Sequence, residues 1–274
     1  MIVEAIKKVA IVTGGASGIG KALCNELISQ GVFVIIADID KEEGKLVEAS
    51  FNRSKLNSRF VLLDVTDFNK VNNILTEVYE EFGRLDYLFN NAGIAMYGEL
   101  YDMYIQDWKE MIDINLWGVI YGTQIGYNIM KKQGFGHIVN TASAAGLGPS
   151  PISTVYSTTK HAVVGLTTSL HYEAEEFGIK VSTLCPAFVD TPIFEKSKAI
   201  KIDKSLIIDQ LKKQKVMAPE RLAKIAILGV HKNKVIICPM PMRKTMDIFF
   251  SLIPPAHDAL MRMVCKVSRQ ARKN

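Results

Sequence analysis

Two side chains that can move a proton, Tyr156 and Lys160, stand four residues apart. In a helix, residues at i and i+4 lie on one face, so the phenol and the ammonium group are predicted to be neighbours. A phenol with an ordinary pKa of about 10 is a poor acid or base at neutral pH. A cation about 5 Å away contributes roughly 3 kcal/mol, which lowers that pKa by about two units. The pair therefore predicts a group that can deprotonate an alcohol or protonate an alkoxide.

A glycine-rich run near the start of the chain is typical of a dinucleotide site. The apolar stretch Val9–Thr13 leads directly into this run, and a helical pattern follows it. Glycines allow a tight turn and let backbone N–H groups approach a pyrophosphate, while the helix N-terminus adds partial positive charge. The predicted contacts with the pyrophosphate are Gly14, Ser17, Gly18, Ile19 and Gly20.

Asp38 ends the second apolar stretch and stands 18 positions after Gly20. A carboxylate about 20 residues past the glycines typically binds the adenosine ribose hydroxyls. It would repel the 2′-phosphate of NADP by on the order of several kcal/mol, and neither Ser17 nor Ile39 supplies a cation. We therefore predict NAD rather than NADP as the coenzyme. The alternative is that Asp38 only caps the following helix.

Short apolar runs alternate with longer helical patterns along the chain. Several runs are apolar almost throughout, as expected of strands covered on both faces. Strand–helix alternation gives right-handed crossovers, so the sequence predicts an α/β fold of Rossmann type, with a doubly wound, parallel, seven-stranded sheet and helices on both faces. The predicted strands are Val9–Thr13, Val32–Ala37, Arg59–Asp64, Leu85–Phe89, His137–Asn140, Lys180–Cys185 and Val235–Cys238. The predicted helices include Lys21–Ser29, Lys41–Lys55 and Phe68–Phe82.

The glycine spacing and four further segments, in this order, resemble the short-chain dehydrogenase/reductase family. The segments are Asn90-Asn91-Ala92-Gly93 after the fourth strand, Asn115 in a long helix, Ser143 after the fifth strand, and Tyr156-Ser157-Thr158-Thr159-Lys160. The resemblance covers about residues 7–239. It implies an enzyme that transfers a hydride between a nicotinamide coenzyme and an alcohol or ketone.

The resemblance also implies a role for each residue of the site. Tyr156 is the implied proton donor or acceptor, and Ser143 binds the substrate oxygen. Lys160 also binds the nicotinamide ribose, and Asn115 holds a water in a relay to Lys160. The implied contacts with the adenine of the coenzyme are Asp64 and Val65. Those on the ribose side are Asn90 and Gly93, with Asn91 and Ala92 between them. Those with the nicotinamide carboxamide are Pro186, Val189 and Thr191. Ala187 stands where the family usually has glycine, which matters only if this position needs a positive φ.

The expected substrate pocket is apolar. Ile94–Tyr97, Ala144–Ile152 and the segment after Thr191 should build it, although such apolar residues equally often pack within a lid. Its apolar members are Met96, Leu147, Phe188, Ile193 and Phe194. Glu195–Lys215 is predicted as a mobile, lysine-rich helical lid, and His161 as a residue of the helix surface.

Residues 240–274 are predicted to extend a single domain that spans residues 1–239. The extension carries seven Lys or Arg and two Asp or Glu, whereas the first 239 residues carry 26 of each sign, which argues against a nucleic-acid surface. Within it, Leu260, Val264, Val267 and Ala271 form a helical stripe, and Arg262, Lys266, Arg269 and Lys273 repeat the spacing on roughly the opposite side. Residues 257–273 could pack on the body or on a subunit neighbour, could lie as an amphipathic helix on an anionic membrane, or could be disordered.

Other features of the sequence narrow the class of protein. No run approaches the ~20 apolar residues of a membrane span, and Met1–Val9 lacks the apolar core of a secretory signal. The four cysteines (Cys24, Cys185, Cys238, Cys265) have no metal-like spacing, so we expect no metal and reduced thiols in a cytoplasmic protein. The resemblance implies a homodimer or homotetramer. Two other functions stay open: a catalytically silent nucleotide-binding regulatory protein on this fold, and an NADP-dependent ketoacyl reductase.

Overall fold

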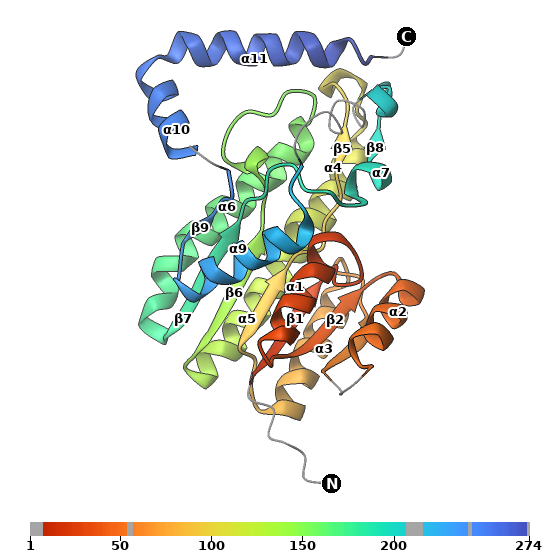
Figure 1. The fold of residues 1–274 in the computed structure, drawn as a ribbon, viewed down its shortest axis with the longest axis vertical. Helices are drawn as coiled ribbons and strands as arrows, with labels where there is room; N and C mark the ends of the chain where they lie inside the picture. The colour runs from red at the N-terminus through yellow and green to blue at the C-terminus, as the bar shows by residue number, and fades with distance from the viewer. Residues whose placement is uncertain (1–7, 54–56, 207–215, 241–242, 273–274) are drawn as a thin grey trace.

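A parallel sheet with the strand order β3-β2-β1-β4-β6-β7-β9 forms the centre of the molecule (Figure 1). The computed structural model describes residues 8–53, 57–206, 216–240 and 243–272. The strands of this sheet are β1 (Val9–Thr13), β2 (Phe33–Asp38), β3 (Ser58–Leu62), β4 (Tyr87–Asn90), β6 (Gly136–Thr141), β7 (Ile179–Leu184) and β9 (Ile236–Ile237). All its strand pairs are parallel, which confirms the predicted seven-stranded Rossmann-type sheet.

Helices connect the strands and cover both faces of the sheet. The α-helices are α1 (Gly18–Ser29), α2 (Lys41–Phe51), α3 (Phe68–Phe82), α4 (Ile105–Ile112), α5 (Gly118–Gln133), α6 (Thr154–Ala174), α7 (Ile193–Lys196), α9 (Pro219–His231), α10 (Arg243–Leu252) and α11 (Pro254–Arg269). Short 3-10 segments span Leu100–Asp102, Ala144–Gly146 and Glu175–Phe177, and a π-helical segment spans Asp113–Trp117.

The alternation of side chains along β1 explains why this strand is apolar throughout. Ala10 and Val12 pack into a core with α1 and α9, whereas Val9 and Ile11 pack into a second core with α3 and α5. All four side chains are inaccessible to water. The sheet is therefore buried on both faces, as parallel sheets generally are.

The path of the chain creates a crevice where strand order reverses. From β1 the chain moves through β2 and β3 to one edge, and then returns to place β4 on the other side of β1. The connections leaving β1 and β4 thus diverge, and the carboxyl ends of these two strands are where such sheets bind ligands.

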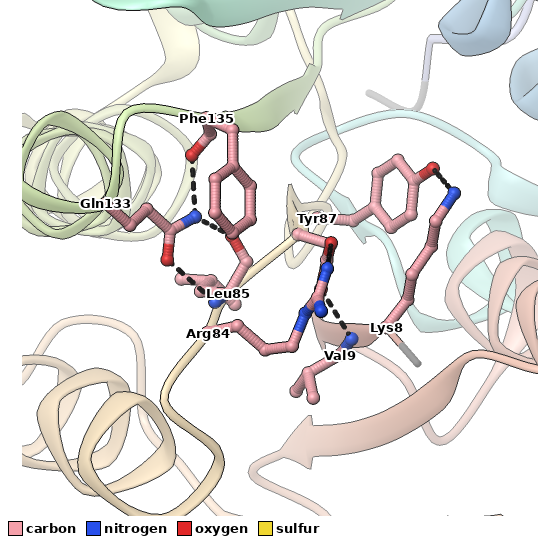
Figure 2. A network of polar contacts seen from close by, with 8 residues as sticks. Lys8, Val9, Arg84, Leu85, Tyr87, Gln133 and Phe135 are labelled. Carbon is pink, nitrogen blue, oxygen red and sulfur yellow. Dashed lines mark hydrogen bonds and ion pairs between the residues drawn. The ribbon is translucent and has the colours of Figure 1, made fainter. Parts of the chain in front are cut away.

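A polar network holds the opposite, amino-terminal ends of β1 and β4 together (Figure 2). The carboxylate of Asp86 accepts hydrogen bonds from the backbone N–H of Val9 at 2.8 Å and from Arg84 Nε and Nη2 at 2.8 and 2.6 Å. Gln133, at the end of α5, accepts from the backbone N–H of Leu85 at 3.1 Å and donates to its carbonyl at 2.7 Å. These bonds align the two central strands from which the site extends.

The segment after α7 differs from the predicted helical lid over Glu195–Lys215. α7 ends at Lys196, and β8 (Lys198–Ala199) then pairs with β5 (Met96–Tyr97) in a separate two-stranded parallel sheet. This pairing joins residues about a hundred positions apart, so a local helical pattern cannot reveal it. Residues 207–215 of the predicted lid, and residues 54–55 of the helix predicted over Lys41–Lys55, lie outside the described residues.

The C-terminal extension forms α10 and α11, which project from the body at the top of Figure 1. α10 and α11 contact each other, and α11 contains no buried residue. The end of the extension is anchored to the body: Ala271 is buried, and its carbonyl accepts a hydrogen bond from the backbone N–H of Asp203 at 2.6 Å. Among the described residues, no helix combines the length and apolarity that crossing a bilayer requires.

Candidate active site

A cavity of about 300 Å³ opens at the carboxyl ends of β1 and β4. Its lining includes most of the residues that the sequence predicted for the site. These are Gly14, Ser17, Gly18, Ile19, Asp38, Asp64, Val65, Asn91, Ala92, Gly93, Tyr156, Lys160, Pro186 and Thr191. Segments spread over much of the chain therefore meet in one place.

The glycine-rich turn between β1 and α1 fits a dinucleotide phosphate. Gly14 has a φ of 65°, and a β-carbon there would lie 2.9 Å from Ala92 Cα. A β-carbon at Gly20 would overlap the carbonyl oxygen of Gly14, so this position allows the helix to start close to the turn. Ser17 is the N-cap of α1, but its side chain makes no capping hydrogen bond. The N-terminus of α1 thus faces the cavity without a side-chain cap, as an anion site requires.

Asp38 is not the N-cap of α2. That role belongs to Asp40, whose carboxylate accepts a hydrogen bond from the backbone N–H of Glu43 at 3.1 Å. Asp38 instead accepts from the backbone N–H of Ala16 at 2.9 Å and from that of Asp40 at 3.0 Å. Its carboxylate therefore joins the end of β2 to the glycine-rich turn while lining the cavity.

Tyr156 and Lys160 lie on one face of α6 at the inner end of the cavity. Lys160 Nζ is 5.6 Å from the centre of the Tyr156 ring and donates a hydrogen bond to the carbonyl of Thr141, at the end of β6, at 2.9 Å. Lys160 is buried, with 3% of its surface exposed, and burial lowers its pKa to about 8. The predicted neighbourhood of phenol and ammonium is thus present.

The pKa of Tyr156 does not follow the shift expected from Lys160 alone. Burial raises it above its ordinary value because the phenolate loses its hydration, and a hydrogen bond with Ser143 opposes this by stabilising the charged form. Ser143 follows β6, is the N-cap of the 3-10 turn Ala144–Gly146, and accepts from the backbone N–H of Ala145 at 3.2 Å. Desolvation therefore outweighs the hydrogen bond with Ser143.

Asn115 lies in the π-helical segment between α4 and α5, within the long helix that the sequence predicted. Its side chain is fully buried and pairs with the backbone of Ile94, accepting from its N–H at 2.8 Å and donating to its carbonyl at 2.9 Å. A β-carbon at Gly93 would lie 3.0 Å from Asn115 Oδ1 and 3.5 Å from Lys160 Nζ. Asn115 thus holds the segment after β4 against the lysine.

Some predicted contacts do not line the cavity. Asn90 is wrong as a contact on the ribose side, because its amide donates to Thr123 at 3.2 Å and to Asn140 at 2.9 Å inside the core. Val189 is also buried in the core. Ser143 and Asn115 adjoin the lining without forming part of it, and Gly20 acts through backbone packing.

The structure also shows the conformation or surroundings of three other residues from the sequence analysis, Ala187, Asp64 and His161. Ala187 is absent from the non-glycine residues with positive φ, so alanine fits where glycine is common. Asp64 closes the turn after β3 by accepting from the backbone N–H and the hydroxyl of Thr66 at 2.9 and 2.8 Å. His161 is exposed on α6, as predicted.

The substrate end of the cavity is only partly as predicted. Ile94 and Ile193 line it, whereas Met96 and Leu147 pack in the interior. Ala95, Pro192 and Lys196, which belong to the predicted segments, line it too. Sequence reasoning missed five further lining residues, namely Ile39, Leu63, Ile114, Thr141 and Ala142. Several of them directly follow strands or adjoin predicted residues, and that proximity was the available signal.

The chain matches known proteins over most of its length. The family model described as short chain dehydrogenase matches residues 8–201. An uncharacterized oxidoreductase of Staphylococcus epidermidis is 35% identical over 191 residues, which are 69% of this chain and 81% of the relative. The 15-hydroxyprostaglandin dehydrogenase [NAD(+)] of Mus musculus is 37% identical over 195 residues, which are 69% of this chain and 70% of the relative.

Solved structures agree with these relatives. A short chain dehydrogenase/reductase of Burkholderia phymatum in complex with NAD superposes with a TM-score of 0.80 at 30% identity, covering 89% of this chain and 93% of that chain. ElxO with NADP bound gives a TM-score of 0.75 at 32% identity, covering 85% and 96%. The family model, the relatives and the glycine-lined cavity lead to one assignment. The chain belongs to the short-chain dehydrogenase/reductase family of nicotinamide-dependent oxidoreductases.

Proposed function

We propose that this protein transfers a hydride between NAD(H) and a secondary alcohol or ketone, with Tyr156 as the general acid or base. The observation that carries the proposal is that Tyr156 and Lys160 line the same cavity as the glycine-rich turn, and that Tyr156 is hydrogen-bonded to Ser143 beside this lining. A nicotinamide bound there supplies the hydride acceptor or donor, and the protein supplies position and the proton.

The raised pKa of Tyr156 suits the reductive direction directly. The phenol stays protonated at neutral pH, so it can donate a proton to the oxygen of a carbonyl as that oxygen gains charge. In the oxidative direction the phenol must first lose this proton. The hydrogen bond with Ser143 and the nearby ammonium of Lys160 both stabilise the phenolate, and they bring that state within reach.

Ser143 positions the substrate in this proposal, and Lys160 binds the nicotinamide ribose. Lys160 already holds the carbonyl of Thr141, and its ammonium lies beside Gly93, where a ribose would pass. Asn115 uses its side chain to hold Ile94, so its part in a proton relay to Lys160 would fall to its backbone carbonyl and a bound water.

NAD is the proposed coenzyme because of the charges around Asp38. The carboxylate faces the cavity, and the only lysines among the lining residues are Lys160 and Lys196, which belong to other segments. A 2′-phosphate would therefore meet a negative charge without a cation to offset it. NADH is expected to bind at least tenfold more tightly than NADPH, and Asp38→Asn should narrow the gap while keeping an acceptor for Ala16. Tighter binding of NADPH by the unaltered protein would refute this preference.

The proposed substrate is apolar, because Ile94, Ala95 and Ile193 line the same cavity as Tyr156. Turnover of a panel of secondary alcohols and ketones of increasing apolar size, monitored through NADH absorbance, tests the activity and the preference for apolar substrates. Binding of NADH without turnover of any member would instead favour the silent regulatory protein, and turnover only of ketoacyl compounds with NADPH would favour the ketoacyl reductase. A dimer or tetramer remains a prediction from the family, and a cytoplasmic location remains a prediction from the cysteines.

A further inference from the structure

The C-terminal extension places large apolar side chains in water. Those of α10 and its junction with α11 are Ile248, Phe249, Leu252 and Ile253, with 61, 48, 76 and 45% of their surfaces exposed. Met263 and Val267, one turn apart on α11, are 57 and 42% exposed. We call these six residues the apolar ridge. Scattered exposed apolar residues are ordinary, but six large ones on two successive helices that contact each other favour a contact surface.

Basic side chains lie beside the ridge. Arg262 and Lys266 are exposed on α11, each adjacent in sequence to a ridge residue, Met263 or Val267. The whole extension carries seven Lys or Arg against two Asp or Glu, whereas the rest of the chain is balanced. Long basic side chains can reach outward while their stems and the neighbouring apolar residues enter a less polar layer. An apolar stripe flanked by cations is the composition of a helix that lies in a lipid interface.

The C-terminal end of α11 is joined to the body by ion pairs. Arg269 and Arg272 form ion pairs with Glu99, and Arg272 Nη2 lies 3.0 Å from the buried carboxylate of Asp102. The backbone of Arg272 also forms a bridge with Ile202. This anchor attaches the C-terminal end of α11 to the segments that follow β5 and β8.

We propose that the apolar ridge and the adjacent basic side chains bind the surface of an anionic lipid bilayer. This binding is separate from catalysis. Charge decides between a bilayer and a second copy of the chain. Two copies meeting through this surface would bring two extensions of the same excess positive charge together, whereas an anionic bilayer neutralises that charge.

Co-sedimentation of the full-length protein with vesicles tests the proposal. One vesicle contains phosphatidylcholine alone, and the other contains about one quarter phosphatidylglycerol. We expect strong binding only to the anionic vesicles, weakened by salt. Substitutions are preferable to truncation, because removing the extension would also break the ion pairs with Glu99 and Asp102.

Two double variants separate the apolar and electrostatic contributions. Phe249→Glu with Leu252→Glu should reduce partitioning at least tenfold, since it places charges on the ridge. Arg262→Gln with Lys266→Gln should reduce it about 30-fold at low salt, as expected for two surface cations. The control for the apolar variant is Leu46→Glu with Leu228→Glu, on α2 and α9. The control for the basic variant is Lys45→Gln with Lys132→Gln. All four of these residues are exposed, and both control variants should bind vesicles like the unaltered protein.

Other outcomes would overturn the proposal. Equal sedimentation of ridge and control variants, or no binding by the unaltered protein, excludes a lipid surface. A self-association seen by sedimentation velocity and abolished by the ridge variant, without vesicle binding, would assign the ridge to a second copy. NADH binding by each variant checks folding, and turnover of a water-soluble alcohol tests the proposed activity separately.

Discussion

Replacing Lys160 with methionine should change how the stability of the coenzyme-free protein depends on pH. Burial lowers the pKa of Lys160 from 10.5 to about 8. Between these values the unfolded chain holds a proton that the folded protein has lost, so the stability contributed by this position rises as pH rises. Below about pH 8 the folded protein carries a buried ammonium, whose desolvation cost methionine removes.

The size of this effect follows from the two pKa values. The number of protons bound at this position differs between the unfolded and the folded protein. Integrating this difference from about pH 7 to about pH 9.5 gives roughly 1.4 pKa units, which corresponds to about 2 kcal/mol in the free energy of unfolding. The unaltered protein should gain this amount relative to Lys160→Met over that range. Tyr156 adds little to the change, because burial holds its pKa above its ordinary value.

Urea unfolding at several pH values measures the difference directly, provided that the slope of the transition is unchanged. The matched control is Lys45→Met on α2, where the side chain is exposed and the curves should stay parallel. If the difference between the unaltered protein and Lys160→Met is constant over this range, the burial argument for the site is wrong. If the unaltered protein loses stability relative to the variant, the sign of the argument is wrong.

Three further substitutions test other parts of the structure. Gly20→Ala should abolish NADH binding, measured by fluorescence titration, because a β-carbon would overlap the Gly14 carbonyl. The control is Gly165→Ala on α6, which should leave binding intact because nothing lies within 4 Å of an added β-carbon there. Asp86→Asn should lower the free energy of unfolding by about 2 to 4 kcal/mol, because Arg84 and the N–H of Val9 lose a charged acceptor; equal urea midpoints would contradict this. Arg272→Ala should lower the free energy of unfolding by about 1 to 3 kcal/mol and raise KM more than it lowers kcat. The reason is that Asp102 loses this ion pair, keeping the one with Lys201 at 3.2 Å, and the segment after β8 loses its anchor; an unchanged KM would show that the anchor does not act on the substrate side.

The sheet and most of the cavity were predictable because their signals are local. Strands covered on both faces must be apolar almost throughout, as β1 is, and the glycine-rich turn and Asp38 lie at strand ends that the topology brings together. The separation of Tyr156 and Lys160 by one helical turn follows from spacing alone.

Other features depend on contacts that spacing does not reveal. β8 exists through its pairing with β5, and the side chain of Asn90 turns toward Thr123 and Asn140 rather than toward the cavity. The direction of the Tyr156 pKa shift depends on the balance between burial and the hydrogen bond with Ser143, and both are properties of the folded protein. The anchor of the extension joins Arg272 to acidic residues about 170 positions away.

The most direct test of the central claim measures coenzyme binding and turnover separately in Tyr156→Phe. This change removes one hydroxyl and keeps the ring, so the affinity for NADH should stay within about twofold. Turnover of the best alcohol or ketone should fall by roughly 10² to 10⁴, the usual contribution of a positioned acid or base. Turnover within about tenfold of the unaltered enzyme, with NADH affinity preserved, would show that the phenol of Tyr156 does not carry the proton.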